Sequence, residues 1–412
     1  MSVPDWFRHR GYRHFDVPVG VAYAEALSPE MVRSHSWSPL IHYTKTQKRY
    51  KPLSGKTVLK SRPIMYASHR DSCILSHYSY LLSGALEKWY ATSGTGQNAI
   101  AYRSLGASNY HFAKDVRDFI ISKSRVQVLC FDVTGFFDNL QHRLLKERLR
   151  WVLGLPELSD DWYSVFKAVT RYHFVNLDEL KGHPQFNQRI RGNAHVPIAT
   201  IAEIKAAGIP IVGNKNPYGI PQGTPISACL SNLYMTDFDE VLARQAEERG
   251  ALYRRYSDDI LIACDPAHGD EFESLVDSNL AARGLALQKS KTERKTLSGK
   301  GRLTFQYLGF QLGRAHAIVR PGSLSRQWRA ARRAVRKAEK AGLKAIRNGK
   351  ATQTFTKKLH LRFNDARARN FLAYSARSAE VLESKAIKNQ TKRLRRFIHR
   401  EMARLKGRPT KP

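Results

Sequence analysis

The sequence is poor in acidic residues and in cysteine, and it has no long apolar run. Asp and Glu number 35 against 69 Lys and Arg, which gives a formal charge of +34. A charge of this size predicts a polyanionic partner. The four cysteines form no CxxC pair, which argues against a zinc site or a disulfide framework. Because no segment resembles a signal peptide or a membrane span, we expect no membrane partner and a cytoplasmic location.

The excess positive charge is concentrated at the C-terminal end of the chain. Residues 323–412 contain 27 Lys and Arg but only 5 Asp and Glu, a net charge of +22. Leu324, Trp328, Ala331 and Val335 recur at three- and four-residue spacing there, and residues 386–405 repeat the pattern. Such spacing predicts helices, and their remaining faces are basic. Helices are also expected over 74–90, 109–122, 160–172, 228–238 and 272–283.

Two adjacent carboxylates stand out in the middle of the chain. Tyr256-Ser257-Asp258-Asp259 is followed by the apolar run Ile260-Leu261-Ile262-Ala263. Turn residues between two candidate strands predict a β-hairpin with both aspartates at its tip. Neighbouring carboxylates repel each other, so a fold keeps them together mainly where cations neutralise them. Taken alone, such a turn is more often a solvated loop.

Two other stretches give this turn a context. Upstream, an apolar strand candidate ends at Asp132 and is followed by a turn with two aromatic residues. Between the two carboxylate stretches lies Tyr218-Gly219-Ile220-Pro221-Gln222-Gly223-Thr224-Pro225. The carboxylate strand, the Gly/Pro loop and the Asp-Asp hairpin, in this order, resemble the palm motifs of reverse transcriptases. The resemblance covers roughly residues 45–322.

The resemblance implies an α+β fold, the right-hand polymerase with fingers, a palm containing an antiparallel sheet, and a helical thumb. The ranges that we assign to these parts are 1–44 for an N-terminal extension, 45–125 for the fingers, 126–322 for the palm and 323–412 for the basic thumb. The roles of residues 1–44 and 173–215 are not legible in the sequence.

The family's chemistry would place two metal ions at the aspartates. By resemblance, Asp132, Asp258 and Asp259 are catalytic and hold two Mg²⁺ ions, with Mn²⁺ as the alternative ion. The backbone carbonyl of Val133, or that of Phe131, could complete the metal shell. Carboxylate and carbonyl oxygens suit these hard cations better than they suit zinc.

A lysine near a third motif would assist the leaving group. The stretch from Gly284 to Thr292 looks like motif D of the family, and Lys291 matches the lysine thought to protonate pyrophosphate. A general acid at this place would lower the cost of expelling charge. The alternative is an ordinary surface lysine, and Lys289 is a near competitor for the role.

Five residues are candidates for binding the incoming nucleotide. Lys60 and Arg62, in a predicted hairpin, match the basic pair that holds the triphosphate in the family's fingers, and the planar fork of arginine suits phosphate. Phe137 falls where the family places an aromatic ring against the 2′ position of the sugar, which predicts selection of deoxynucleotides. Gln222 and Gly223 would lie against the nascent base pair. The alternatives without a function are a solvated edge strand for Lys60 and Arg62, a core residue for Phe137, and a tight connection for the loop with Gln222 and Gly223.

Contacts with primer and template are expected further along the chain. Phe305 to Phe310 resembles the primer-grip hairpin, and the basic helices stand where the thumb would be. These candidates are Tyr307, Leu308, Gly309, Arg332, Arg336, Arg393 and Arg396.

The resemblance therefore implies a magnesium-dependent RNA-directed DNA polymerase that uses dNTPs and an RNA template to make DNA. Ala101-Tyr102-Arg103 looks like the bacterial defence-associated, or "unknown group", enzymes, with retron and group II intron enzymes as relatives. We expect a stand-alone polymerase in anti-phage defence with a structured non-coding RNA partner. Open alternatives are a retron-type enzyme, an untemplated or protein-primed DNA polymerase, an RNA-dependent RNA polymerase and a non-catalytic RNA-binding scaffold. The oligomeric state stays open.

Overall fold

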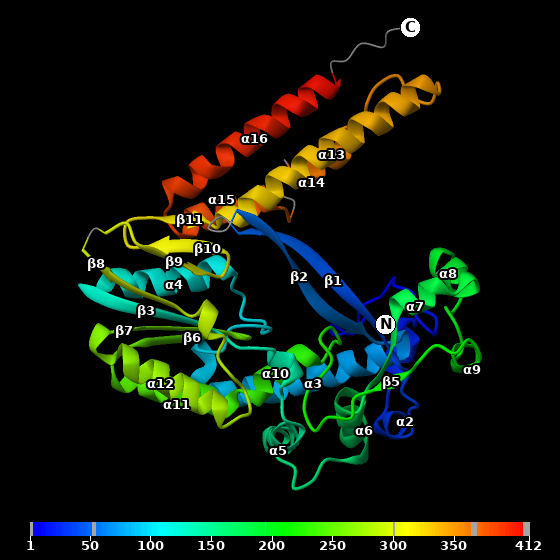
Figure 1. Ribbon diagram of the computed structural model, residues 1–412, viewed down its shortest axis with the longest axis horizontal. Helices are drawn as coiled ribbons and strands as arrows, with labels where there is room; N and C mark the ends of the chain where they lie inside the picture. The colour runs from blue at the N-terminus through cyan, green and yellow to red at the C-terminus, as the bar shows by residue number, and fades with distance from the viewer. Residues whose placement is uncertain (1–2, 52–54, 194, 300, 364–368, 407–412) are drawn as a thin grey trace.

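The computed structural model is an α+β fold in which sheets are packed against helices (Figure 1). The structure describes residues 3–51, 55–193, 195–299, 301–363 and 369–406. Within these ranges the strands form a catalytic sheet, a fingers sheet and a small third sheet. No helix in the described part of the chain is both long and apolar enough to cross a membrane.

The catalytic sheet has the strand order β6-β7-β3-β8 and is antiparallel throughout. Its strands are β3 (Arg125–Asp132), β6 (Leu252–Tyr256), β7 (Asp259–Cys264) and β8 (Glu293–Ser298). Strand β3 is central, and its last residue, Asp132, lies opposite Asp259, the first residue of β7. The register therefore brings two segments far apart in sequence to the same edge of one sheet.

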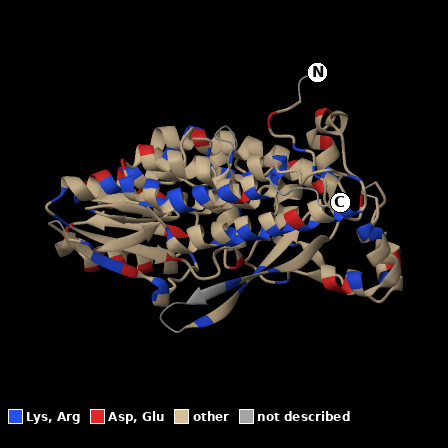
Figure 2. Ribbon diagram, turned by 90° about the horizontal axis from the view of Figure 1, so that it is seen from above, with Lys and Arg blue, Asp and Glu red and all other residues tan. Residues whose placement is uncertain are grey.

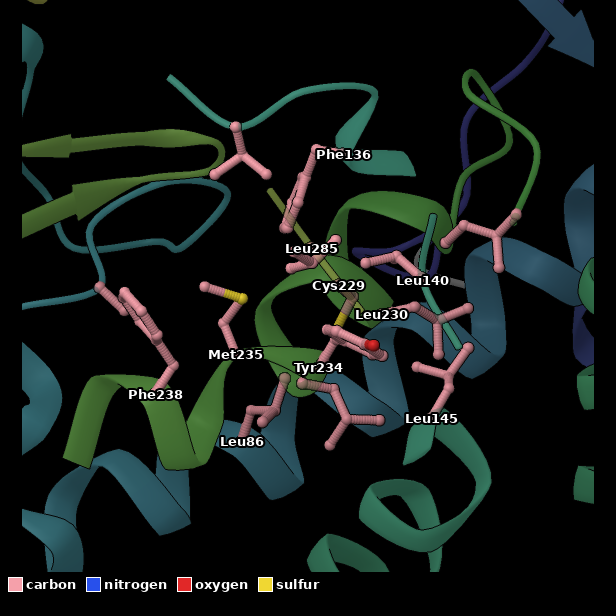
Figure 3. Packing of buried hydrophobic residues seen from close by; sticks show 14 of the residues in the cluster. Leu86, Phe136, Leu140, Leu145, Cys229, Leu230, Tyr234, Met235, Phe238 and Leu285 are labelled. Atoms are coloured by element: carbon pink, nitrogen blue, oxygen red, sulfur yellow. The ribbon is translucent and has the colours of Figure 1, made fainter. Parts of the chain in front are cut away.

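Both faces of this sheet are buried, because alternate side chains of a strand point to opposite sides. Along β7, Ile260 and Ile262 join a large core with α3, α5, α10 and α11, while Leu261 and Ala263 join a second core with α4 and the third sheet. Figure 3 shows the first core, where Phe136 lies among residues of α10 and α11. Burial on both faces fixes the register strongly, since a slip of one residue would exchange the faces.

Helices surround the catalytic sheet. Those packed around it and around the fingers are α3 (His69–Ser93), α4 (Asn109–Ser122), α5 (His142–Leu153), α6 (Asp160–Thr170), α10 (Ser227–Tyr234), α11 (Thr236–Glu248) and α12 (Gly269–Ala281). The helix predicted over 109–122 coincides with α4 at both ends. The helix predicted over 228–238 is instead two helices, because the Met235 amide bonds the Asn232 carbonyl three residues back and tightens the chain there.

The fingers sheet has the order β2-β1-β4-β5. Its strands are β1 (Leu40–Lys51), β2 (Lys56–Tyr66), β4 (His173–Asn176) and β5 (Val212–Gly213), and between the last two lie α7 (Leu177–Gly182), α8 (Pro184–Arg191) and α9 (Ile201–Ala206). The boundary drawn at residues 44 and 45 falls inside β1, so the sheet does not divide there. Strands β4 and β5 fall in the range that was assigned to the palm, yet β4 pairs with β1 and β5 with β4, so both belong to this sheet and not to the catalytic sheet.

The N-terminal segment, with the short helices α1 (Val21–Glu25) and α2 (Pro29–Arg33), packs on the fingers. The carboxylate of Asp16 accepts hydrogen bonds from the first amides of α3. His14 is buried; it accepts the Phe15 amide at Nδ1 (2.8 Å) and faces the Tyr66 carbonyl with Nε2 (3.2 Å). Because Nδ1 accepts a hydrogen bond, it carries no proton, and Nε2 carries the proton that it donates to the carbonyl. The imidazole ring is therefore neutral.

The third sheet and four helices complete the chain. The sheet is β11-β10-β9, built from β9 (Thr304–Tyr307), β10 (Phe310–Gly313) and β11 (Ala317–Val319). Beyond it stand α13 (Pro321–Arg347), α14 (Lys357–Phe363), α15 (Phe371–Val381) and α16 (Lys385–Lys406). Helices α13 and α16 extend away from the sheets side by side (Figure 1), and the view down on them shows Lys and Arg spaced along both (Figure 2).

Candidate active site

Three carboxylates meet at one edge of the catalytic sheet. Asp132 and Asp259 are register partners on β3 and β7, and Asp258 lies in the turn between β6 and β7. Ser257 closes this turn with φ +61°, a left-handed conformation that non-glycine residues seldom adopt. The sequence predicted both the hairpin and the aspartates at its tip, and the structure adds the pairing with Asp132.

A buried ion pair anchors the turn. The Arg255 guanidinium donates to both carboxylate oxygens of Asp239 (2.7 and 2.5 Å), and both side chains are fully buried. Its third nitrogen donates to the Ser257 carbonyl and to the Asn232 side chain, each at 3.2 Å. The Tyr253 hydroxyl also donates to Asp239 (2.6 Å). The strained residue is thus fixed by a charged donor with no exposure to water.

The Val133 carbonyl is oriented toward the aspartate turn. Hydrogen bonds from Thr134 to Ala286 and from Gln288 to Asp132 flank the pairing of Val133 with Leu287. In this antiparallel pattern the residue between the two bonds turns its own amide and carbonyl to the opposite side. The opposite side of β3 is the β7 side, where Asp259 lies.

Lys291 reaches the same place from the other side of β3. It ends the short 3₁₀ helix η5 (Lys289–Lys291), and its ammonium forms an ion pair with the carboxylate of Asp132. The competitor Lys289 lies instead 3.8 Å from Asp277 and is more exposed. Of the two lysines, only Lys291 is positioned at the carboxylates.

The electrostatics of the cluster favour a cation. Burial, followed by the charges of Asp258 and Asp132, raises the pKa of Asp259 to about 6. Burial and the Asp132 charge also raise the pKa of Asp258. Within the described residues, no group of three or more His, Cys, Asp or Glu side chains is close enough to hold a metal ion. The cation that Asp132 contacts is the ammonium of Lys291. Carboxylates that oppose one another's ionisation fit divalent cations.

Lys60 and Arg62 lie on strand β2 of the fingers sheet. They lie two residues apart on β2, paired with Gln47 and Lys45 of β1, so their side chains project from the same face. Burial raises the pKa of Asp258, and the positive charges of Arg62 and Lys60 offset part of that rise. Both side chains are exposed.

The loop containing Gln222 and Gly223 joins the fingers to the palm. The Gln222 carbonyl accepts the Met65 amide of β2 (2.9 Å), and the Ile220 amide donates to the Phe137 carbonyl (2.9 Å). Gly223 has φ +125°, and a Cβ there would lie 2.6 Å from the Met65 carbonyl oxygen. Only glycine allows this approach, so the loop is held against the strand that carries the two basic residues.

The two neighbouring phenylalanines differ in burial. Phe136 is only 4% exposed and packs in the core (Figure 3), whereas Phe137 is partly exposed and packs against that core. Of the two, Phe137 is the ring that a ligand could contact, and its role beside the sugar stays a prediction.

The remaining predicted residues lie outside the carboxylate cluster. Tyr307 is buried in the second core, and Leu308 and Gly309, both with positive φ, form the turn between β9 and β10. The thumb arginines are exposed on α13 and α16: Arg332, Arg336, Arg393 and Arg396.

Sequence reasoning missed the anchoring network of Arg255, Asp239 and Asn232. Arg255 stands in an apparently ordinary strand beside Arg254, and its partner comes from α11. The one available signal was an arginine directly before a predicted catalytic turn, which alone does not separate a buried residue from a solvated one.

The fold places three aspartates at one edge of an antiparallel sheet. The model of the family "Reverse transcriptase (RNA-dependent DNA polymerase)" matches residues 72–312. The chain belongs to this reverse transcriptase family. The finer subgroup is not distinguished by this match, and no curated protein matches the chain.

Solved structures of telomerases are similar to the chain. Apo telomerase from Candida tropicalis is 13% identical, with a TM-score of 0.47 over 92% of this chain and 62% of that one. Telomerase from Candida albicans, solved in complex with the TWJ fragment of telomeric RNA, is 13% identical, with a TM-score of 0.46 over 73% of this chain and 48% of that one. This chain thus spans roughly half to three fifths of their length.

Proposed function

We propose that the protein is an RNA-directed DNA polymerase that extends a DNA strand on an RNA template. The observation that supports this most directly is the meeting of Asp132, Asp258 and Asp259 at one sheet edge, with Lys291 beside them. Burial and the charges of Asp258 and Asp132 raise the pKa of Asp259, so a bound cation would stabilise the ionised carboxylates.

Asp132, Asp258, Asp259 and the Val133 carbonyl would hold two Mg²⁺ ions. When bound, the ions would lower the pKa of the primer 3′-hydroxyl and stabilise charge in the in-line phosphoryl transfer. The ammonium of Lys291 forms an ion pair with Asp132. We propose that nucleotide binding releases its ammonium to protonate the pyrophosphate oxygen as the bond to the leaving group breaks.

Other residues would orient the nucleotide. Lys60 and Arg62 would bind the triphosphate from the fingers side. Gln222, whose carbonyl accepts the Met65 amide of the same strand, and Gly223 beside it would lie against the new base pair. The partly exposed ring of Phe137 would exclude a 2′-hydroxyl by its bulk.

Primer and template would follow the third sheet and the thumb. The turn at Leu308 and Gly309, with Tyr307 packed beneath it, would grip the primer end. The helices α13 and α16 would contact nucleic-acid phosphates. The division into fingers, palm and thumb remains part of this proposal, with β4 and β5 counted with the fingers sheet.

The biological setting that we propose is anti-phage defence with a structured non-coding RNA as template. The support is Ala101-Tyr102-Arg103, which resembles the bacterial defence-associated enzymes. In the structure Arg103 is tied to Glu87 (2.7 and 2.6 Å) and stacks over Tyr90 at 3.8 Å, leaving Tyr102 exposed.

Incorporation of labelled dNTPs by the purified protein with its bound nucleic acid tests the function. We expect DNA synthesis that RNase pretreatment abolishes, that chelation stops, and that Mg²⁺ or Mn²⁺ restores. D132A and D258A should abolish synthesis without unfolding the chain, while the matched control D270A, at an 87% exposed carboxylate, should not.

Three results would contradict the proposal. Full activity in either aspartate variant would refute the metal assignment. RNase-resistant synthesis would indicate a DNA template or untemplated, protein-primed synthesis. Bound RNA without any synthesis in the presence of metal and dNTPs would indicate a scaffold.

A further inference from the structure

A cleft on the thumb combines aromatic rings with arginines. It lies between α13 and α16 and has a volume of about 550 Å³. The residues that line it are Trp328, Arg332, Arg393, Arg396, Phe397 and Arg400. No carboxylate is among them, so the lining presents four positive charges.

The rings fix the positions of two of these arginines. Trp328 and Phe397 are partly buried in the thumb core, with ring centroids 5.3 Å apart and planes tilted by 47°. The guanidinium of Arg332 lies 5.5 Å from the Trp328 centroid, and that of Arg400 lies 5.8 Å from the Phe397 centroid. Cation–π contacts hold charges at such sites. The arginines on either side of the cleft are therefore preorganised.

The surrounding carboxylates leave the cleft positive. Glu339 and Glu401 are both bound by Arg404 (2.9 and 2.8 Å), and of the cleft arginines only Arg400 has a partner, Glu401 at 3.5 Å. Among the described residues, no ion pair or hydrogen bond of Arg332, Arg393 or Arg396 is present. Three crowded guanidinium groups without a carboxylate partner favour an anion, and their planar forks match phosphate oxygens.

We propose that this cleft, the thumb cleft, binds an unpaired nucleotide of single-stranded RNA outside the primer–template duplex. The arginines would take its flanking phosphates, and its base would stack on the layer of rings and guanidiniums. A cavity of this volume accepts a ligand of nucleotide size, whereas a duplex keeps its bases stacked inside and offers only its backbone. Unstacked bases held on aromatic and arginine planes are the usual mode of single-strand recognition.

The choice of RNA rests on the proposed function. In RNA-directed DNA synthesis the product is paired with its template, so the strand left unpaired is RNA. A second cavity of about 680 Å³ lies on the other flank of α16, with Lys388, Lys392, Arg395 and His399, and Arg396 lines both cavities. A bound strand could therefore continue across α16 through Arg396.

The test measures binding of labelled oligo-rU, of oligo-dT of the same length and of a blunt RNA–DNA duplex to the full chain. Each strand has roughly 12 nucleotides, within the size of single-strand sites. The cleft variant is R393Q/R396Q. The matched control is R333Q/K337Q, which removes the same charge from exposed positions of α13 that do not line the cleft.

We expect R393Q/R396Q to weaken oligo-rU binding by about tenfold or more and to reduce the slope of log affinity against log salt by about 1.4. The control should lose less than about threefold, and the duplex should respond equally to both variants. Oligo-rU should also quench part of the tryptophan fluorescence of the wild type, and W328F should lack that part.

Equal losses in the two variants would show general electrostatics and overturn the cleft as a site. Tighter, cleft-dependent binding of oligo-dT would overturn the assignment to RNA. The thermal midpoints of all variants distinguish weak binding from unfolding. If W328F is unstable, the binding by R393Q/R396Q decides whether the cleft is a site for RNA. If the wild type makes no DNA but still binds oligo-rU through the cleft, the proposed polymerase function is refuted and the binding site is retained. If R393Q/R396Q makes DNA and binds oligo-rU as the wild type does, only the inference about the cleft is refuted.

Discussion

Replacing Arg255 by methionine tests the anchoring of the aspartate turn. Arg255 and Asp239 are fully buried, so R255M leaves a buried carboxylate with the Tyr253 hydroxyl as its remaining side-chain donor. Breaking a buried pair from one side costs about 3–5 kcal/mol. With an unfolding entropy of roughly 2.1 cal/mol/K per residue and 412 residues unfolding as one unit, the thermal midpoint should fall by about 4–6 °C.

The double variant R255M/D239L separates stability from geometry. Exchanging a whole buried pair for apolar residues is often neutral, so the remaining loss should be about 1–3 kcal/mol from the unpaired Tyr253 hydroxyl. The Ser257 carbonyl still lacks its donor. We therefore expect kcat for dNTP incorporation to stay about 10–100-fold low, with R255K intermediate.

Thermal denaturation and steady-state dNTP incorporation, run on the same preparations, measure both effects. A double variant with the wild-type kcat would show that the arginine does not position the turn. A single variant R255M with an unchanged midpoint would refute the account of the buried pair.

F137A should raise the ratio of ribonucleotide to deoxynucleotide incorporation by about 10–200-fold, measured as a ratio of kcat/KM values. G223A adds a methyl group 2.6 Å from the Met65 carbonyl oxygen, so kcat/KM for dNTPs should fall at least about tenfold. Burial lowers the pKa of His14 from 6.5 to about 4. The unfolded chain binds the extra proton first, so stability is full above pH 6.5 and falls toward pH 4 by up to about 3 kcal/mol, which denaturant titrations against pH measure.

Each of these expectations has a result that contradicts it. An unchanged sugar preference in F137A would assign the ring to packing. Normal kinetics in G223A would mean that the loop can move away from the fingers strand. For the pH effect, Asp16 and His69 are the titratable groups that act on His14, and H14Q should flatten the slope; an equally steep slope in H14Q would place its origin elsewhere.

The catalytic strands could be predicted because local patterns specify them. Alternation and turn residues indicated the hairpin at Asp258, and an apolar run ending in Asp132 indicated the facing strand. The meeting of the two came from the resemblance, since no local pattern states which strands pair.

Elements defined by distant contacts escaped prediction. Strand β4 has four residues and β5 only two, which is too few to show a periodic pattern. They are strands because β1 pairs with β4 and β4 pairs with β5. Likewise, nothing near Arg255 shows that its guanidinium is buried, because the carboxylate that makes burial tolerable comes from a helix of another segment.

The central position of β3 has a consequence for how the chain is made. Its neighbours β7 and β8 end at residues 264 and 298, well after β3 ends at residue 132. At a synthesis rate of roughly 5–20 residues per second, β3 waits about 7–26 s for β7 and longer for β8. During translation this apolar strand therefore has both edges open to wrong partners. We expect the yield of active protein to depend on chaperones that cover β3 on the ribosome until the second half of the palm has emerged.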